Sequence, residues 1–214
     1  MNLYSAPETP VPADPAVAAI TAKDGVVLRV ARWSAGSASR GSIAILPGRA
    51  EFIERYFETV SDLLERRFDV VVMDWRGQGL SERQLRDHRK GHVDDFDLYQ
   101  ADLAALAENV LEPFCPKPWF ALGHSMGGAI LIAQARAGLS PFSRIVVAAP
   151  MIALAKLRFR KLTAFCMECL DILGFGGAYV PGVRRKPVFL QSFSQAALTS
   201  DAARYRHAAG IVCA

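Results

Sequence analysis

Residues 119–135 read WFALGHSMGGAILIAQA, and this stretch decides the fold. A short apolar run, typical of a buried strand, stops at Gly123. A segment rich in Ala, Ile and Leu, typical of a helix, begins directly after Ser125. A chain that turns from strand to helix within so few residues needs backbone angles that glycine adopts most easily. The stretch therefore predicts a strand, a very tight turn and a helix, with Ser125 at the apex of the turn.

The turn has the frame Gly-x-Ser-x-Gly, in which the two glycines are Gly123 and Gly127. Between a strand and a helix, this frame places a serine nucleophile. Glycine is needed at both flanks because a Cβ there would collide with the neighbouring element. The N–H of Met126 and the start of the helix would face negative charge that develops on a reacting carbonyl. The alternative is an ordinary glycine-rich turn, but the flanking strand and helix favour a catalytic serine.

The composition is that of a globular protein. The 214 residues are 51% hydrophobic and 21% charged, which predicts one folded domain with a substantial core. The net charge is +4, but no long Lys/Arg run or basic stripe interleaved with aromatic residues is present, so we expect no nucleic-acid partner. No stretch of 18 or more apolar residues and no basic-then-apolar leader occurs, which predicts a cytoplasmic protein. Peripheral contact with the inner face of a membrane is compatible with this charge.

The four cysteines are too few for a disulfide scaffold: Cys115, Cys166, Cys169 and Cys213. Cys166 and Cys169 have the C-x-x-C spacing, but no second pair or nearby histidine cluster completes a zinc site. We expect buried thiols, no metal and no cofactor.

Short apolar runs alternate with helical patterns along the chain. The predicted strands are residues 26–33, 43–46, 68–73, 119–122 and 144–149. The predicted helices are residues 55–67, residues 97–111, which Pro113 should close, and the segment after Ser125. Polar loops follow the strands. The alternation predicts an α/β fold with a doubly wound, mostly parallel sheet that binds its ligand at the carboxyl ends of the strands.

Three regions are expected. Residues 1–15 contain four prolines and predict a flexible N-terminal arm, extended or disordered. Residues 16–150 form the α/β core. Residues 151–214 break the alternation with apolar helical segments, which predicts a helical cap region over the site.

Three strand-end loops carry motifs in a fixed order. They are PGRAEFIERY at residues 47–56, DWRGQGLS at residues 74–81 and GHSMGG at residues 123–128. With these motifs the chain resembles the α/β-hydrolase superfamily, and more closely its serine hydrolases of the monoacylglycerol lipase and bacterial lysophospholipase branch. Members show H-G-x-x-E-H-x-x-R-Y at the first loop, where this chain has Pro47 and Phe52 in place of the histidines. The resemblance covers roughly residues 20 to 212.

The resemblance implies that Ser125 is the nucleophile. The backbone N–H groups of Arg49 and Met126 would form the oxyanion hole, which suits the charge that appears when serine attacks an ester. No cofactor is implied. Other residues of the three loops are expected to order the site rather than react: Glu51, Arg55, Asp74, Arg76 and His124.

A serine nucleophile needs a histidine base and an orienting acid, which follow the elbow in this superfamily. The only later histidine is His207, and Asp201 lies six residues before it, so the two would point in different directions on one helix. His88 and His92 precede the elbow and are no better candidates. We expect the hydrolase fold to be C-terminally incomplete, with the triad acid and base unknown and absent from this chain. The alternative is a complete but shortened protein.

The expected function is a serine ester hydrolase of lysophospholipase or monoacylglycerol lipase type, whose partner is a small lipid or ester substrate. An esterase or amidase for small soluble substrates is the neighbouring possibility. The alternative class is an inactive fragment or a non-enzymatic ligand-binding protein. The oligomeric state is not indicated. Apolar cap residues could line an acyl site or simply pack on the core: Leu154, Leu157, Phe159, Leu162, Phe165 and Leu170.

Overall fold

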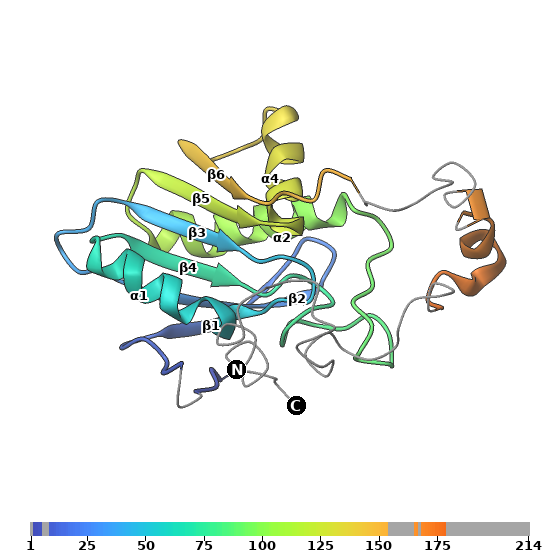
Figure 1. Ribbon diagram of the computed structural model, residues 1–214, viewed down its shortest axis with the longest axis horizontal. Coiled ribbons are helices and arrows are strands. Elements are labelled where there is room, and N and C mark those ends of the chain that lie inside the picture. Colours follow the sequence, from blue (N-terminus) through green and yellow to red (C-terminus); the bar gives the residue numbers. More distant parts are fainter. Residues whose placement is uncertain (1, 6–8, 154–164, 167, 179–214) are drawn as a thin grey trace, which may run out of the picture.

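A computed structural model of the chain describes residues 2–5, 9–153, 165–166 and 168–178, and within them one six-stranded sheet (Figure 1). The strand order is β1-β2-β4-β3-β5-β6. Strands β3, β4, β5 and β6 run parallel to one another, whereas β2 pairs antiparallel with both β1 and β4. The bounds are β1 Ala16–Thr21, β2 Val27–Trp33, β3 Ser42–Leu46, β4 Asp69–Met73, β5 Trp119–His124 and β6 Arg144–Ala148. This confirms the predicted α/β fold with a mostly parallel sheet.

Helices cover both faces of the sheet (Figure 1). Helix α1, Phe57–Glu65, packs on one face, where Trp33, Ile45 and Val60 belong to the core. Helices α2, Leu98–Leu106, and α4, Met126–Arg136, pack on the other face, with a core that includes Trp75 and Ile130. The shorter helical segments are η1 Ile53–Tyr56, η2 Ala107–Leu111, α3 Glu112–Phe114 and η3 Asp171–Phe175. The sheet is therefore doubly wound, as the alternation predicts.

The parallel register brings three strand ends together. Ile45 of β3 pairs with Val72 of β4 on one side and with Leu122 of β5 on the other. One residue further along, Leu46 pairs with Gly123. The loops that leave β3, β4 and β5 therefore start side by side at one edge of the sheet, where an α/β fold binds its ligands.

Two features differ from the prediction. Strand β1, whose sequence AVAAIT is rich in alanine, has little strand propensity and is formed by pairing along its whole length with Val27–Arg32 of β2. The second helix does not close at Pro113, because the chain continues as α3 to Phe114. The π-helical turn η2, directly before α3, interrupts the regular hydrogen-bond ladder where a proline would otherwise clash.

Within the described residues, the predicted buried strand at residues 144–149 is an exposed edge strand. β6 pairs with β5 on one side, and Val146 is 61% exposed. An all-apolar run predicts a strand but not how well its faces are covered. The thiols also differ from expectation, because Cys115 is buried but Cys166 is exposed and Cys169 is half-buried, while Cys213 lies outside the described residues.

The described part of the N-terminal arm lies against the core. The carbonyl of Pro12 accepts a hydrogen bond from Trp33 Nε1 at 3.1 Å, and that of Asn2 accepts one from Arg29 at 3.0 Å. Most of the predicted cap, including residues 200–211, lies outside the described residues. Its described helix stands to the side of the sheet, and Lys90 Nζ donates to the carbonyl of Gly177 at 2.6 Å (Figure 1). None of the helices in the described ranges has the length and apolarity needed to cross a bilayer.

Candidate active site

Ser125 occupies the turn between β5 and α4 with a strained backbone. Its φ of 48° and ψ of −110° lie in a region that residues with a side chain rarely adopt. Hydrogen bonds on both sides hold this conformation: the Ser125 N–H donates to Ala148 at 3.0 Å, and the Ser125 carbonyl accepts from Met151 at 2.9 Å. The serine is half-buried, so its side chain is still accessible.

The flanking glycines permit this turn because a Cβ at either position would collide with the neighbouring element. A Cβ on Gly123 would lie 2.8 Å from the Cα of Gly128. A Cβ on Gly127 would overlap the carbonyl oxygen of Leu46 and lie 2.7 Å from that of Pro47. The elbow therefore packs directly on the end of β3.

The loop after β3 passes against Ser125. A Cβ on Gly48 would lie 3.1 Å from the Cβ of Ser125, which measures how closely the Gly48 backbone approaches. Arg49 follows at once, and Met126 begins α4 beside Ser125. Among the described residues, the backbone N–H groups of Arg49 and Met126 donate no hydrogen bond. The structure thus places the loop that carries Arg49 beside Ser125 and Met126, and the roles predicted for these three residues stay predictions.

Glu51 orders this loop through one carboxylate oxygen. Its Oε2 accepts hydrogen bonds from the Gly48 N–H at 2.6 Å and the Tyr56 hydroxyl at 2.6 Å, and it lies 2.9 Å from His124 Nδ1. Burial opposes the charge of Glu51, but the hydrogen bonds from His124 and Tyr56 outweigh it and lower the pKa of Glu51 to about 2. The bond to Glu51 raises the pKa of His124 above its ordinary 6.5. The first-loop motif predicts that Glu51 orders the loop, but its spacing does not identify His124 as the partner.

Gln78 joins the second loop to both other loops. The N–H of Ala50 donates to its Oε1, and its Nε2 lies 3.9 Å from the Sδ of Met126. Trp75, in the same loop, donates from Nε1 to the carbonyl of Pro47 at 2.8 Å. The motif at residues 74–81 contains Gln78, but its pattern alone predicts no role for this side chain.

Buried ion pairs between Arg29 of β2 and the acidic residues Asp74 and Glu54 stabilise these loops. Asp74 accepts from Arg29 Nε at 2.7 Å and from the Ile53 N–H at 2.9 Å, and Glu54 binds the same guanidinium at 2.7 Å. Arg29, Asp74 and Glu54 are fully buried. Charge-assisted bonds of this kind fix geometry, which agrees with the structural role expected for Asp74.

Arg76 forms a second buried network. Its Nε donates to Asp102 in α2 at 2.8 Å, and its NH2 donates to Asp24 in the β1–β2 turn at 3.1 Å. The loop after β4 is therefore tied to a helix and to a hairpin. Arg76 has the structural role that the sequence analysis expects.

No histidine of the described residues is hydrogen-bonded to the Ser125 hydroxyl. His124 pairs with Glu51, and His92 pairs with Asp94 at 2.8 Å. His207 and Asp201 lie outside the described residues. The base and the acid of a triad are therefore not identified in the part of the chain that the structure describes.

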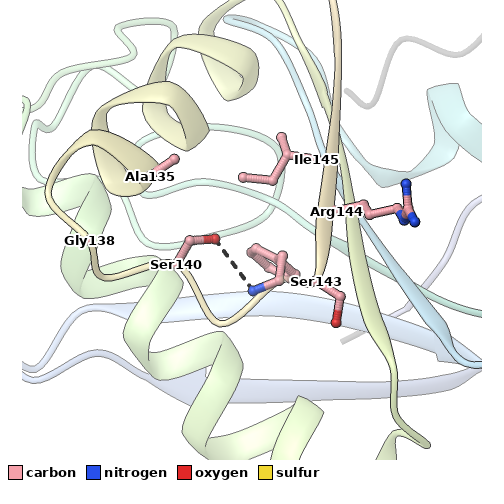
Figure 2. Close-up of a pocket in the computed structure, with 7 residues that line it drawn as sticks. Ala135, Gly138, Ser140, Ser143, Arg144 and Ile145 are labelled. Carbon is pink, nitrogen blue, oxygen red and sulfur yellow. Dashed lines mark hydrogen bonds between the residues drawn. The ribbon is translucent and has the colours of Figure 1, made fainter.

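A cleft of about 370 Å³ lies at the other end of β6 and is separate from this site. It is lined by Ala135, Gly138, Ser140, Phe142, Ser143, Arg144 and Ile145. Figure 2 shows that Arg144 projects from the side of β6 opposite Ile145. Because β6 runs from Arg144 to Ala148, and Ala148 is the residue that binds Ser125, the cleft and the elbow lie at opposite ends of the strand.

Comparisons with known proteins agree with this architecture. Residues 37–210 match the family described as serine aminopeptidase, S33. Lysophospholipase L2 of Escherichia coli is 40% identical over 139 residues, which are 63% of this chain and 39% of that protein. The monoglyceride lipase of Rattus norvegicus is 32% identical over 131 residues, 60% of this chain and 41% of that protein. The chain thus spans about two fifths of the length of the curated relatives it matches.

Solved structures show the same fold. A thermostable carboxyl esterase from Bacillus coagulans superimposes with a TM-score of 0.65 at 19% identity, over 78% of this chain and 53% of that one. The sheet order, the elbow geometry and the sequence match lead to one conclusion: the chain belongs to the serine aminopeptidase, S33, family of the α/β-hydrolase superfamily, in the branch that includes bacterial lysophospholipases and monoglyceride lipases.

Proposed function

We propose that this chain carries the nucleophile and oxyanion hole of a serine ester hydrolase for lipid-like monoacyl substrates, such as lysophospholipids or monoacylglycerols. Ser125 Oγ bonds to the ester carbonyl carbon, the alcohol leaves with the serine proton, and water then releases the fatty acid. The N–H groups of Arg49 and Met126 stabilise the oxyanion of each tetrahedral intermediate. Peripheral contact with a membrane surface, where such substrates reside, is part of the proposal.

One observation carries this proposal: the Gly48 backbone lies against a strained, half-buried serine. Strain of this kind costs roughly 1–3 kcal/mol and persists where the surrounding structure enforces it, often at reactive residues. Two amides that donate to no other group among the described residues, one in the loop after β3 and one at the start of α4, suit an oxyanion. Loss of one such donor typically costs about 3 kcal/mol of barrier.

The substrate class rests on the relatives and on the cap. The names of the relatives, lysophospholipase and monoglyceride lipase, favour a lipid ester over a peptide. Two members of the predicted acyl stripe fall within the described residues: Phe165, which is 63% exposed, and Leu170, which is half-buried. An exposed aromatic ring of the cap is available to contact an acyl chain.

A fluorophosphonate probe tests the nucleophile. It should label Ser125 in the 214-residue chain or in the longest natural form of the protein, and peptide mass spectrometry should locate the adduct. Ser125→Ala should lose the label. Ser143→Ala removes an exposed serine at the other end of β6 and should keep it. No labelling of Ser125 in the longest natural form would exclude the hydrolase.

A substrate panel tests the lipid preference separately. A lysophospholipid, a monoacylglycerol and a short-chain nitrophenyl ester should be compared at equal enzyme concentration. We expect the two lipid esters to be hydrolysed with the higher kcat/KM. Hydrolysis of the short ester alone would keep the nucleophile and reassign the protein to esterases for small soluble substrates.

A second candidate is a ligand-binding protein without hydrolase activity. The absence of a histidine bonded to Ser125 among the described residues favours it. Oxyanion donors and binding alone leave only a small residual acceleration when triad members are missing. Reversible binding of a monoacyl lipid without labelling of Ser125 would support this candidate.

A further inference from the structure

We propose that Gln78 is a positioning residue that fixes the distance between the two halves of the oxyanion hole. This inference rests on the proposed function and adds to it a residue from the third loop. Gln78 lies after β4 and is only 4% exposed. Its Oε1 accepts the N–H of Ala50, the neighbour of Arg49, and its Nε2 lies 3.9 Å from the Sδ of Met126. The carboxamide of Gln78 therefore contacts Ala50, the residue after one proposed donor, and the side chain of Met126, the other proposed donor.

The backbone of Gln78 is itself fixed. Its N–H donates to the carbonyl of Trp75 at 3.0 Å, and its carbonyl accepts from Ser81 at 3.1 Å. The glycines on either side have φ values of +70° at Gly77 and +51° at Gly79, which only glycine adopts readily. A Cβ on Gly79 would overlap the buried carboxylate of Asp74. The conformation of the turn that carries Gln78 therefore depends on the packing of Gly79 against Asp74, which is ion-paired with Arg29.

Arg83 reinforces the same turn. Its guanidinium donates to the carbonyls on both sides of Gln78, at Gly77 through NH1 and at Gly79 through NH2 at 2.9 Å. A planar guanidinium offers donors in a rigid fork, so these two bonds hold the carbonyls at a fixed separation. Gln78 therefore has little freedom to follow the loop after β3 if that loop moves, and instead holds it in place.

The physical effect follows from geometry. The bond from the Ala50 N–H to Gln78 fixes the peptide unit that joins Arg49 to Ala50. The Arg49 N–H lies in the preceding unit, separated from this one only by the φ and ψ angles of Arg49, and the Gly48 carbonyl of that unit accepts from the Glu51 N–H at 3.3 Å. Loss of the Gln78 bond would therefore free the loop on one side of the Arg49 N–H. A displacement of about 1 Å in a catalytic group can cost on the order of 100-fold in rate. Glutamate cannot replace Gln78 at neutral pH, because it lacks the donor toward the weakly accepting Met126 thioether and adds negative charge beside a developing oxyanion.

The test compares Gln78→Leu and Gln78→Glu with Gln84→Leu, which alters an exposed glutamine further along the same β4–α2 connection. Ester hydrolysis and the rate of fluorophosphonate labelling at Ser125 should be measured in the longest natural form. Gln78→Leu should lower kcat and the labelling rate about 10- to 100-fold, with KM within about twofold, because the ground-state contacts remain. Gln84→Leu should match the parent.

Gln78→Glu supplies a readout that a merely structural role would not move. Its rate relative to the parent should rise as the pH falls, because a protonated glutamate is neutral and again carries a donor. Hydrogen exchange gives a second readout, since the Ala50 amide should exchange faster in Gln78→Leu. If Gln78→Leu does not fold, the nearly isosteric Gln78→Glu carries the test.

The outcomes separate the two proposals. Two results would overturn the role of Gln78 and leave the hydrolase proposal intact, provided that the parent is labelled at Ser125. One is an unchanged rate in Gln78→Leu, and the other is a rate ratio for Gln78→Glu that does not depend on pH. No labelling of the parent overturns both. A lower kcat, a rising rate ratio and faster exchange at Ala50 support the positioning role.

Discussion

Glu51 and His124 are joined side chain to side chain, with 2.9 Å between Oε2 and Nδ1, although 73 residues separate them in the chain. Glu51 belongs to the loop that carries Arg49, and His124 is the last residue of β5 before Ser125. The pair thus holds the proposed oxyanion loop against the elbow, and it has consequences for activity and for pH dependence.

Glu51→Gln should slow the reaction without abolishing it. The carboxylate oxygen that serves Gly48, Tyr56 and His124 becomes a neutral amide oxygen, which is a weaker acceptor for three partners. We expect kcat to fall about tenfold with little change in KM, because the loop moves relative to Ser125. Steady-state kinetics of ester hydrolysis would measure this. Glu65→Gln, an exposed position on α1, is the control, and equal kcat values for the two variants would contradict the prediction.

The same pair should make stability depend on pH within a defined window. The folded-state pKa of His124 is raised, so its contribution is complete below about 6.5 and is lost as the pH rises through the folded value. The pKa of Glu51 is lowered to about 2, so its contribution is complete above 4.5 and is lost as the pH falls toward about 2. Urea unfolding at pH values of about 3, 5.5 and 9 should show the largest difference between the parent and His124→Gln at the middle value. A difference that is constant across the three would argue against the linkage.

Gly127→Ala should destabilise the protein although alanine is the better helix former. In a helix interior the exchange normally gains about 1 kcal/mol, but here the new Cβ would overlap the carbonyl oxygen of Leu46. We expect a loss of roughly 1–3 kcal/mol and no labelling at Ser125, because the elbow must leave the end of β3. Gly91→Ala is the matched control, since the nearest atom to its Cβ would be 3.4 Å away. Denaturant unfolding of both variants decides the matter, and a stabilised Gly127→Ala would refute the packing argument.

Arg29→Met should be among the most destabilising single changes in the core. It leaves Glu54 and Asp74 fully buried without their shared cation, which typically costs about 3–5 kcal/mol. Arg29→Lys should recover only part of this, because an ammonium cannot reproduce the fork that meets both carboxylates. Arg32→Met, on the same strand, removes a partly exposed guanidinium that lies 5.5 Å from the ring centroid of Phe114 and should cost under about 1 kcal/mol. Urea titrations measure the free energy of unfolding of both variants. Similar losses in Arg29→Met and Arg32→Met would show that the buried network contributes little to stability.

The sequence was sufficient where a local pattern fixes the structure. The parallel core strands are short apolar runs that stop at Pro47 or Gly123 or in a polar loop, and the elbow has its own spacing of glycines. Ala16–Thr21 could not be identified in this way, because an alanine-rich segment becomes a strand only through its partner β2. The exposure of Val146 could not be predicted from the sequence either, since it depends on which other segments cover the sheet.

The contacts that order the site were also beyond local patterns. The Ala50 N–H donates to Gln78, 28 residues away in the sequence, and Gln78 donates to Met126, 48 residues away. The pair of His124 and Glu51 spans 73 residues. Motif spacing names the residues of three loops but not which side chains reach across between them. Only the register of β3, β4 and β5 decides that.

The two main-chain bonds of Ser125, to Ala148 and to Met151, tie the apex of the elbow to β6, the last strand of the described sheet, and to the residues that follow it. A strand at the margin of a sheet frays before the centre does, so gentle heating of the 214-residue chain should loosen this support while the helical circular dichroism signal persists. Activity should therefore be lost at a lower temperature than the fold. Substitutions that stabilise β6 should raise the temperature at which labelling at Ser125 is lost, without shifting the main melting transition.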